Sequence, residues 1–219
     1  MIYFFRQNRI GVFTFADVSA KCKNMGQERK KMPEPKRLEF RKTKDITYIA
    51  VFAVMIAICS WISIPAAVPF TLQTFAVFFA VGVLGGKRGT LAVLVYILLG
   101  AAGIPVFAGF SGGIGVLAGQ TGGYIAGFLF SAFVMWGIEK IMGRKLPVQI
   151  LSMTLGLLAC YAVGTAWFML VYARTAGTVG VGAVLGWCVI PFILPDAAKI
   201  VLACVLSRKL APVLKNMEG

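Results

Sequence analysis

Six apolar runs, separated by short polar or glycine-rich segments, organise the chain from residue 46 onward. The first five cover about residues 46–64, 74–86, 90–103, 121–142 and 148–173, and the last begins between Cys188 and Pro195 and ends at Arg208. A helix needs about 20 mostly apolar residues to cross a bilayer. The second and third runs are shorter, so we expect them to be tilted or extended by the flanking loops. The pattern predicts an all-α integral membrane protein with six transmembrane helices.

Basic residues cluster between the runs in an alternating way. Segments 1–45, 87–88, 144–145 and 208–219 are all basic, whereas the segments on the opposite side contain Arg174 as their one basic residue. Cytosolic loops of membrane proteins are enriched in Lys and Arg. This bias predicts that both termini are cytosolic.

Three regions follow from this division. Residues 1–45 form a basic cytosolic tail, which we expect to be disordered because it carries 12 basic and 5 acidic residues. In a signal peptide the basic residues come before the apolar core, whereas here the dense charges follow the apolar stretch at the N-terminus. Met25 or Met32 is an alternative translation start. Residues 46–210 form the six-helix membrane domain, and residues 211–219 form a cytosolic C-terminal tail.

Composition narrows the possible chemistry. The chain is 59% hydrophobic, with a net charge of +14, no histidine and five cysteines. The positive charge lies in loop clusters rather than in a continuous patch, so we expect no nucleic-acid partner. Without histidine or a cysteine cluster we expect no metal site and no cofactor. The sequence also has no phosphate-binding loop, and a catalytic residue set is missing, so we do not expect an enzyme.

Asp196 and Lys199 stand apart because they lie deep in apolar sequence. Ionised side chains within membrane helices usually mark a substrate path or a relay. Residues three apart share one face of a helix. Two interpretations remain open: the two residues neutralise each other as a structural pair, or they offer an acceptor and a donor to a polar ligand. Pro195 suits the first position of a helix; if the last helix begins there, Asp196 lies in its first turn.

Two irregular segments are expected on the same, external side as this pair. Pro65 and Pro69 break the first helix and favour extended or turning backbone. A second segment, residues 104–124, contains seven glycines, which allow a close approach of the backbone to a ligand or to a neighbouring helix. The glycines fit a lid and tight helix packing equally well. Together the three features predict a pocket that opens to the outside.

The first apolar run carries small residues near one face, at Ala50, Ala53 and Ala57. This small-xxx-small spacing allows another helix to approach closely. Alanine is also common in ordinary membrane helices, so the pattern fits internal packing as well.

Four ordered motifs resemble those of the BioY family, the biotin-specific substrate-capture subunits of energy-coupling-factor transporters. They lie within about residues 44–210 and read Pro69-Phe70-Thr71-Leu72-Gln73-Thr74-Phe75, Pro105-Val106-Phe107-Ala108-Gly109, Thr121-Gly122-Gly123-Tyr124, and Pro191-Phe192 with Asp196 and Lys199. Two positions depart from the family pattern. Gln120 replaces a usual proline, and Leu194-Pro195 replaces a usual Pro-Gly before the aspartate.

The resemblance implies a biotin site on the outer face, closed by the loops after the first and third helices. It implies docking of the first helix, through Ala50, Ala53 and Ala57, on a transmembrane coupling subunit, with two cytosolic ATPases supplying the energy. It also implies a multi-pass protein among the lipids of the bacterial cytoplasmic membrane.

Biotin's ureido ring has one carbonyl acceptor and two N–H donors, so Asp196 and Lys199 suit it. The other candidate site residues are Gln73, Tyr124, Phe107 and Phe110, with Arg174, the glycine loop or Lys199 for the biotin carboxylate. A different vitamin within the same transporter class, a channel or structural subunit, and a membrane enzyme are the alternative functions.

Overall fold

The computed structural model describes residues 34–64, 68–175, 177 and 179–218, and within them it is almost entirely helical. The long helices are α2 (Glu34–Trp61), α6 (Gly122–Met142), α7 (Leu146–Thr175) and α9 (Ile190–Glu218), and the shorter ones are α3 (Gln73–Leu84), α4 (Gly86–Ala101), α5 (Ile114–Ala118) and α8 (Val181–Cys188). The four long helices each contain a stretch long and apolar enough to cross a membrane. The prediction of an all-α membrane fold is confirmed, with at least four candidate spans.

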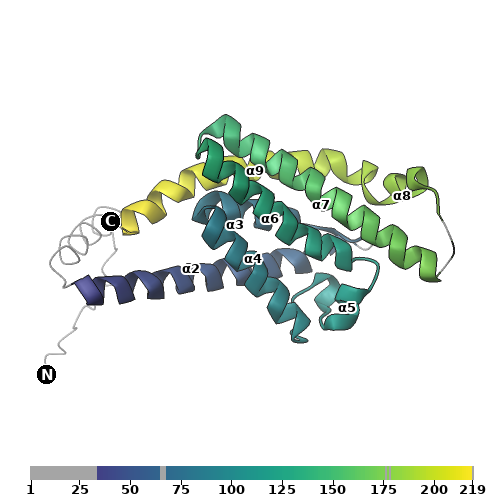
Figure 1. Ribbon diagram of the computed structural model, residues 1–219, viewed down its shortest axis with the longest axis horizontal. Helices are drawn as coiled ribbons and strands as arrows, with labels where there is room; N and C mark the ends of the chain where they lie inside the picture. The colour runs from purple at the N-terminus through teal and green to yellow at the C-terminus, as the bar shows by residue number, and fades with distance from the viewer. Residues whose placement is uncertain (1–33, 65–67, 176, 178, 219) are drawn as a thin grey trace, which may run out of the picture.

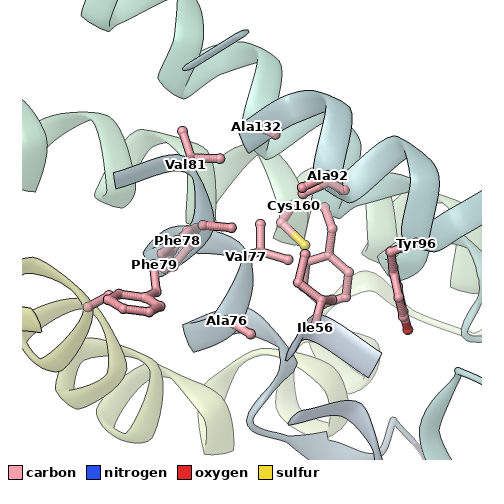
Figure 2. Close-up of a cluster of buried hydrophobic side chains, with 14 of the residues drawn as sticks. Ile56, Ala76, Val77, Phe78, Phe79, Val81, Ala92, Tyr96, Ala132 and Cys160 are labelled. Carbon is pink, nitrogen blue, oxygen red and sulfur yellow. The ribbon is translucent and has the colours of Figure 1, made fainter. Parts of the chain in front are cut away.

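Helix α3 is the centre of the bundle. Ten of its twelve residues are buried, because its sequence is apolar on every side and such a helix is stable only when surrounded. Figure 2 shows Val77, Phe78 and Val81 of α3 among side chains from α2, α4, α6 and α7, including Ile56, Ala92, Tyr96, Ala132 and Cys160. Helices α2, α4, α6 and α9 therefore pack around α3.

The turn between α3 and α4 is fixed by two charged side chains, Glu139 in the last turn of α6 and Arg144 between α6 and α7. Gly85 has a φ of +88°, a backbone conformation that glycine adopts without steric cost. Arg144 donates a 2.8 Å hydrogen bond to the carbonyl of Gly82 near the end of α3, and Glu139 accepts a 2.7 Å bond from the N–H of Gly86 at the start of α4. Arg144 and Glu139 are themselves paired at 2.9 Å. Backbone groups that the two helix ends leave unpaired are thereby satisfied.

The two irregular segments have more structure than the sequence indicates. The extended backbone expected around Pro65 and Pro69 is confirmed on both sides of residues 65–67, where β1 (Ser63–Ile64) pairs antiparallel with β2 (Phe70–Thr71). The glycine-rich segment contains the 3₁₀ turn η1 (Ala108–Phe110) and the short helix α5. Figure 1 shows α5 and α8 at the end of the bundle opposite the start of α2 and the end of α9.

Helices α2 and α9 extend beyond the apolar runs predicted from the sequence. Residues 34–45 and 211–218, expected to belong to tails, are the ends of α2 and α9. They are rich in strong helix formers, and polarity alone does not distinguish a helical extension in water from a disordered tail. Residues 1–33 lie outside the described part. Helix α9 begins at Ile190, so Pro195 is inside it and Asp196 lies in its second turn.

The three alanines of α2 do not share one environment. Ala53 is 1% exposed and Ala57 is 5% exposed, and both belong to the hydrophobic core, whereas Ala50 is exposed. In this structure the small side chains of Ala53 and Ala57 face the interior of the bundle, and their assignment to a docking surface stays a prediction. Of the three, Ala50 alone remains accessible.

Candidate small-molecule binding site

A cavity lies at the end of the bundle that holds α5 and α8, where the two irregular segments meet α6, α7 and α9. Its empty volume is about 730 Å³, a figure that includes open solvent at its mouth. Its lining combines apolar side chains with a few polar ones, among them Thr71, Gln73, Thr121, Tyr124, Tyr161 and Asp196. The predicted convergence of the two irregular segments and the last helix is thus present in the structure.

Asp196 is the charged side chain that lines this cavity, and it is only 2% exposed. One carboxylate oxygen, Oδ1, accepts a 2.8 Å hydrogen bond from Lys199 Nζ, and the other, Oδ2, accepts a 2.6 Å bond from the hydroxyl of Tyr161. A carboxylate has about four lone-pair positions. Asp196 is therefore held from two sides and still has capacity to accept a hydrogen bond from a ligand.

Lys199 lies behind Asp196 rather than in the cavity wall. Its Nζ donates a second hydrogen bond, of 2.7 Å, to the carbonyl of Thr71 and lies 4.1 Å from the ring centroid of Phe70. Lys199 thereby joins α9 to strand β2 and neutralises Asp196. In the structure the Nζ of Lys199 is bonded to protein groups, and Asp196 lines the cavity. Whether the pair binds a ligand or is purely structural stays a prediction.

The apolar wall of the cavity is built from fixed aromatic rings. Phe107 is buried and packs edge-on against Tyr96, with ring centroids 5.6 Å apart. The hydroxyl of Tyr96 accepts a 2.9 Å hydrogen bond from the side-chain amide of Gln73. The ring of Phe107 lies so close to Gly100 that a Cβ at this position would overlap it. Glycine at position 100 therefore allows Phe107 to take its place in the wall.

Tyr124 forms a second part of the wall, at the start of α6. Its hydroxyl lies 3.2 Å from the hydroxyl of Thr165 on α7, and its ring rests on the backbone of Gly164. A Cβ at position 164 would overlap this ring. The position of Tyr124 thus depends on Gly164 of α7, which lies forty positions further along the chain.

The site residues predicted from sequence separate into two groups. Asp196, Tyr124, Gln73 and Phe107 line the cavity. Lys199, Phe110 and Arg174 are not among the lining residues. Phe110 is 64% exposed and stacks on Trp61, with ring centroids 5.0 Å apart, and Arg174 is exposed in the last turn of α7.

Sequence reasoning missed Tyr161, which donates to Asp196, and two cavity cysteines, Cys160 and Cys188. One sequence signal for Tyr161 exists: a phenol in the middle of an apolar run has a polar tip that usually finds a partner when buried. Which partner it finds depends on how α7 packs against α9, and spacing along the chain does not contain that information.

The fold and the cavity together define a class of protein. The chain is an all-helical, multi-pass membrane protein whose one end encloses a mostly apolar cavity with a buried carboxylate. Pockets of this composition bind small molecules, with the polar groups fixing the orientation of the ligand.

The chain belongs to the BioY family, whose model matches residues 29–216. It is 41% identical over 170 residues to a probable biotin transporter BioY of Pyrococcus horikoshii, covering 77% of this chain and 97% of that protein. It is 42% identical over 161 residues to the biotin transporter BioY of Thermotoga maritima, covering 73% and 91%. Its fold is similar to a crystal structure of the S-component for biotin from an ECF-type ABC transporter. That comparison has a TM-score of 0.70 and 26% identity, and covers 82% of this chain and 94% of the other.

Proposed function

We propose that this chain is a biotin-capture subunit, the S-component, of an energy-coupling-factor transporter and not an enzyme. The family match and the named relatives support this function. The structural observation that carries it is the buried carboxylate of Asp196 in the wall of an otherwise largely apolar, aromatic cavity. A ligand that joins a small polar ring to an apolar ring and an apolar chain suits such a cavity.

In this proposal Asp196 accepts a hydrogen bond from a ureido N–H of biotin. Its position between Lys199 and Tyr161 keeps the carboxylate fixed before the ligand arrives, which lowers the entropy lost on binding. The thiophane ring and the valeryl chain then pack on Phe107 and Tyr124. Lys199 acts mainly through Asp196, because its hydrogen bonds go to Asp196 and to the carbonyl of Thr71.

The biotin carboxylate would lie towards the glycine-rich segment. Arg174 does not line the cavity, whereas Ser111 and Thr121 of this segment do. Their hydroxyl groups and neighbouring backbone N–H groups are donors suited to a carboxylate. Gln73 also lines the cavity, and its side-chain amide is held by the hydroxyl of Tyr96.

We further propose six transmembrane helices with both termini in the cytosol of a bacterial cell and the cavity open to the outside. The basic segments at the start of α4, between α6 and α7, and at the end of α9 support this orientation. Helices α3 and α4 have 12 and 16 residues, so they reach across the membrane only together with the segments that flank them.

The partners proposed for transport are a transmembrane coupling subunit and two cytosolic ATPases. With Ala53 and Ala57 in the core, the accessible face of α2 includes Ala50, Val51, Val54 and Ile58. These positions recur at three- and four-residue spacing and so form one stripe along the helix. We assign the docking of the coupling subunit to this stripe.

Equilibrium titration of the detergent-purified full-length protein with biotin tests the proposed function. We expect saturable binding of one biotin per chain, with no displacement by an excess of thiamine or riboflavin. A protein that binds one of these vitamins more tightly than biotin would show that the substrate assignment is wrong. A channel or a purely structural subunit predicts no saturable binding of any vitamin.

Gly164→Ala tests whether the placement of Tyr124 matters for binding. The added Cβ forces the Tyr124 ring towards the cavity, so we expect biotin affinity to fall roughly tenfold, since crowding of a packed site commonly costs about 1–3 kcal/mol. Gly137→Ala on α6 is the matched control, because a Cβ there meets no atom within 4 Å. Equal affinities for the two variants, measured by the same titration, would remove Tyr124 from the site.

A further inference from the structure

A second cavity lies at the opposite end of the bundle from the biotin pocket. Its empty volume is about 1390 Å³ including open space. It forms because α3, with twelve residues, ends at Leu84, while α9 continues to Glu218. Figure 1 shows the start of α2 and the end of α9 extending past the end of α3 on the left of the view. We call this cavity the basic recess.

Three arginines from different elements line the basic recess: Arg88 at the start of α4, Arg144 between α6 and α7, and Arg208 on α9. Arg88 is paired with Asp45 at 2.8 Å, and Arg144 is paired with Glu139 at 2.9 Å. Arg208 has no ion pair with a described residue. The recess therefore contains two arginines held in place by carboxylates and a third whose charge is not compensated.

The remaining wall of the basic recess is largely apolar, and includes Leu84, Ala211 and Leu214. The adjacent surface of α9 exposes Leu210 and Val213, which suits contact with lipid chains. An inorganic anion would use the arginines and leave the apolar wall unused. An amphiphile with an anionic head would use both.

We propose that the basic recess binds the phosphate of an anionic phospholipid from the cytosolic leaflet, with an acyl chain along Leu84 and Leu214. Basic pockets between membrane helices on the cytosolic side commonly bind anionic lipid headgroups. Guanidinium groups suit phosphate because they donate two parallel hydrogen bonds, and each has five N–H donors. The lipid fills the space below the short α3 and supports the ends of α4 and α9.

Native mass spectrometry of the full-length protein tests this proposal, with phosphatidylglycerol and phosphatidylcholine supplied in equal amounts. We expect the protein to retain phosphatidylglycerol in preference to phosphatidylcholine. Arg208→Gln should reduce that preference roughly fivefold, the effect of about one basic residue at an anionic membrane surface. Lys209→Gln is the matched control, since Lys209 is exposed on the same turn but does not line the recess. Unchanged biotin affinity shows that each variant is folded.

Three outcomes would overturn the proposal. The first is a parent protein with no preference for phosphatidylglycerol. The second is an equal loss of the preference in both variants, which would indicate an effect of general surface charge. The third is displacement of the lipid by millimolar inorganic phosphate, which indicates a site for free anions. Loss of coupling-subunit binding in Arg208→Gln with lipid binding unchanged would assign the recess to a protein partner instead.

Discussion

Replacing Asp196 with Ala is expected to lower biotin affinity by roughly ten- to a hundredfold or more, because a hydrogen bond to a charged group contributes about 1.5–3 kcal/mol. The same change leaves Lys199 buried without its carboxylate, and removal of one member of a buried pair commonly costs about 3–5 kcal/mol of stability. Lys199→Met should destabilise the protein for the same reason, since it leaves the carboxylate unpaired. Titration with biotin and thermal unfolding of each purified variant measure the two effects separately.

The double variant Asp196→Asn/Lys199→Met separates a ligand-binding role from a purely structural one. Because it contains no unpaired charge, we expect its thermal stability to recover most of the loss, while its biotin affinity stays low. Tyr161→Phe is the intermediate case: it removes one donor to Asp196 but leaves the ion pair intact, so affinity should fall less than in Asp196→Ala. A stable double variant that binds biotin like the parent would falsify the assignment of Asp196 to the ligand.

The second large effect is expected at α2, where Ala53→Trp should prevent stable folding. Ala53 is 1% exposed in the core, and overpacking by a whole indole ring should cost about 3 kcal/mol or more. Ala50→Trp is the matched control, three residues earlier on the exposed side of the same helix. It should fold and bind biotin normally but co-purify less well with the coupling subunit.

Protein yield, biotin binding and co-purification with the coupling subunit together check this prediction. An Ala53→Trp variant that folds and binds biotin like the parent would show that this face of α2 is not packed against the bundle. An Ala50→Trp variant that assembles normally would move the docking surface away from the stripe formed by Ala50, Val51, Val54 and Ile58.

The sequence predicted the membrane class and the meeting of three distant segments, because both depend on hydrophobic length and on alternating charge. The apolar runs identified α6 and α7 to within two residues at each end. They did not identify the helical residues 34–45, because a polar helix and a polar tail have similar compositions. The last helix begins at Ile190, inside the predicted interval from Cys188 to Pro195, but it does not begin at Pro195 itself, which lies in the second turn of α9.

Within the site, spacing alone placed Asp196 and Lys199 on one face of a helix, and the structure pairs them at 2.8 Å. The further contacts of each side chain were not predictable from the sequence. Lys199 bonds to Thr71 and Asp196 to Tyr161, and both partners come from other parts of the chain. Phe110 was expected in the site as an aromatic side chain for the thiophane ring and valeryl chain of biotin. The loop instead directs it towards Trp61, and a one-dimensional pattern does not specify the direction of a loop side chain.

The short length of α3 has a consequence for how the protein is made. A helix of twelve residues rises about 18 Å, well short of the roughly 30 Å hydrocarbon layer. It cannot span the bilayer as an independent unit during synthesis, because its ends would place unpaired peptide groups in lipid. We expect α3 and α4 to leave the translocon as a single hairpin around Gly85. Final burial of α3 then waits until α6, Arg144 and α9 have been synthesised, so its packing is a late step in biogenesis.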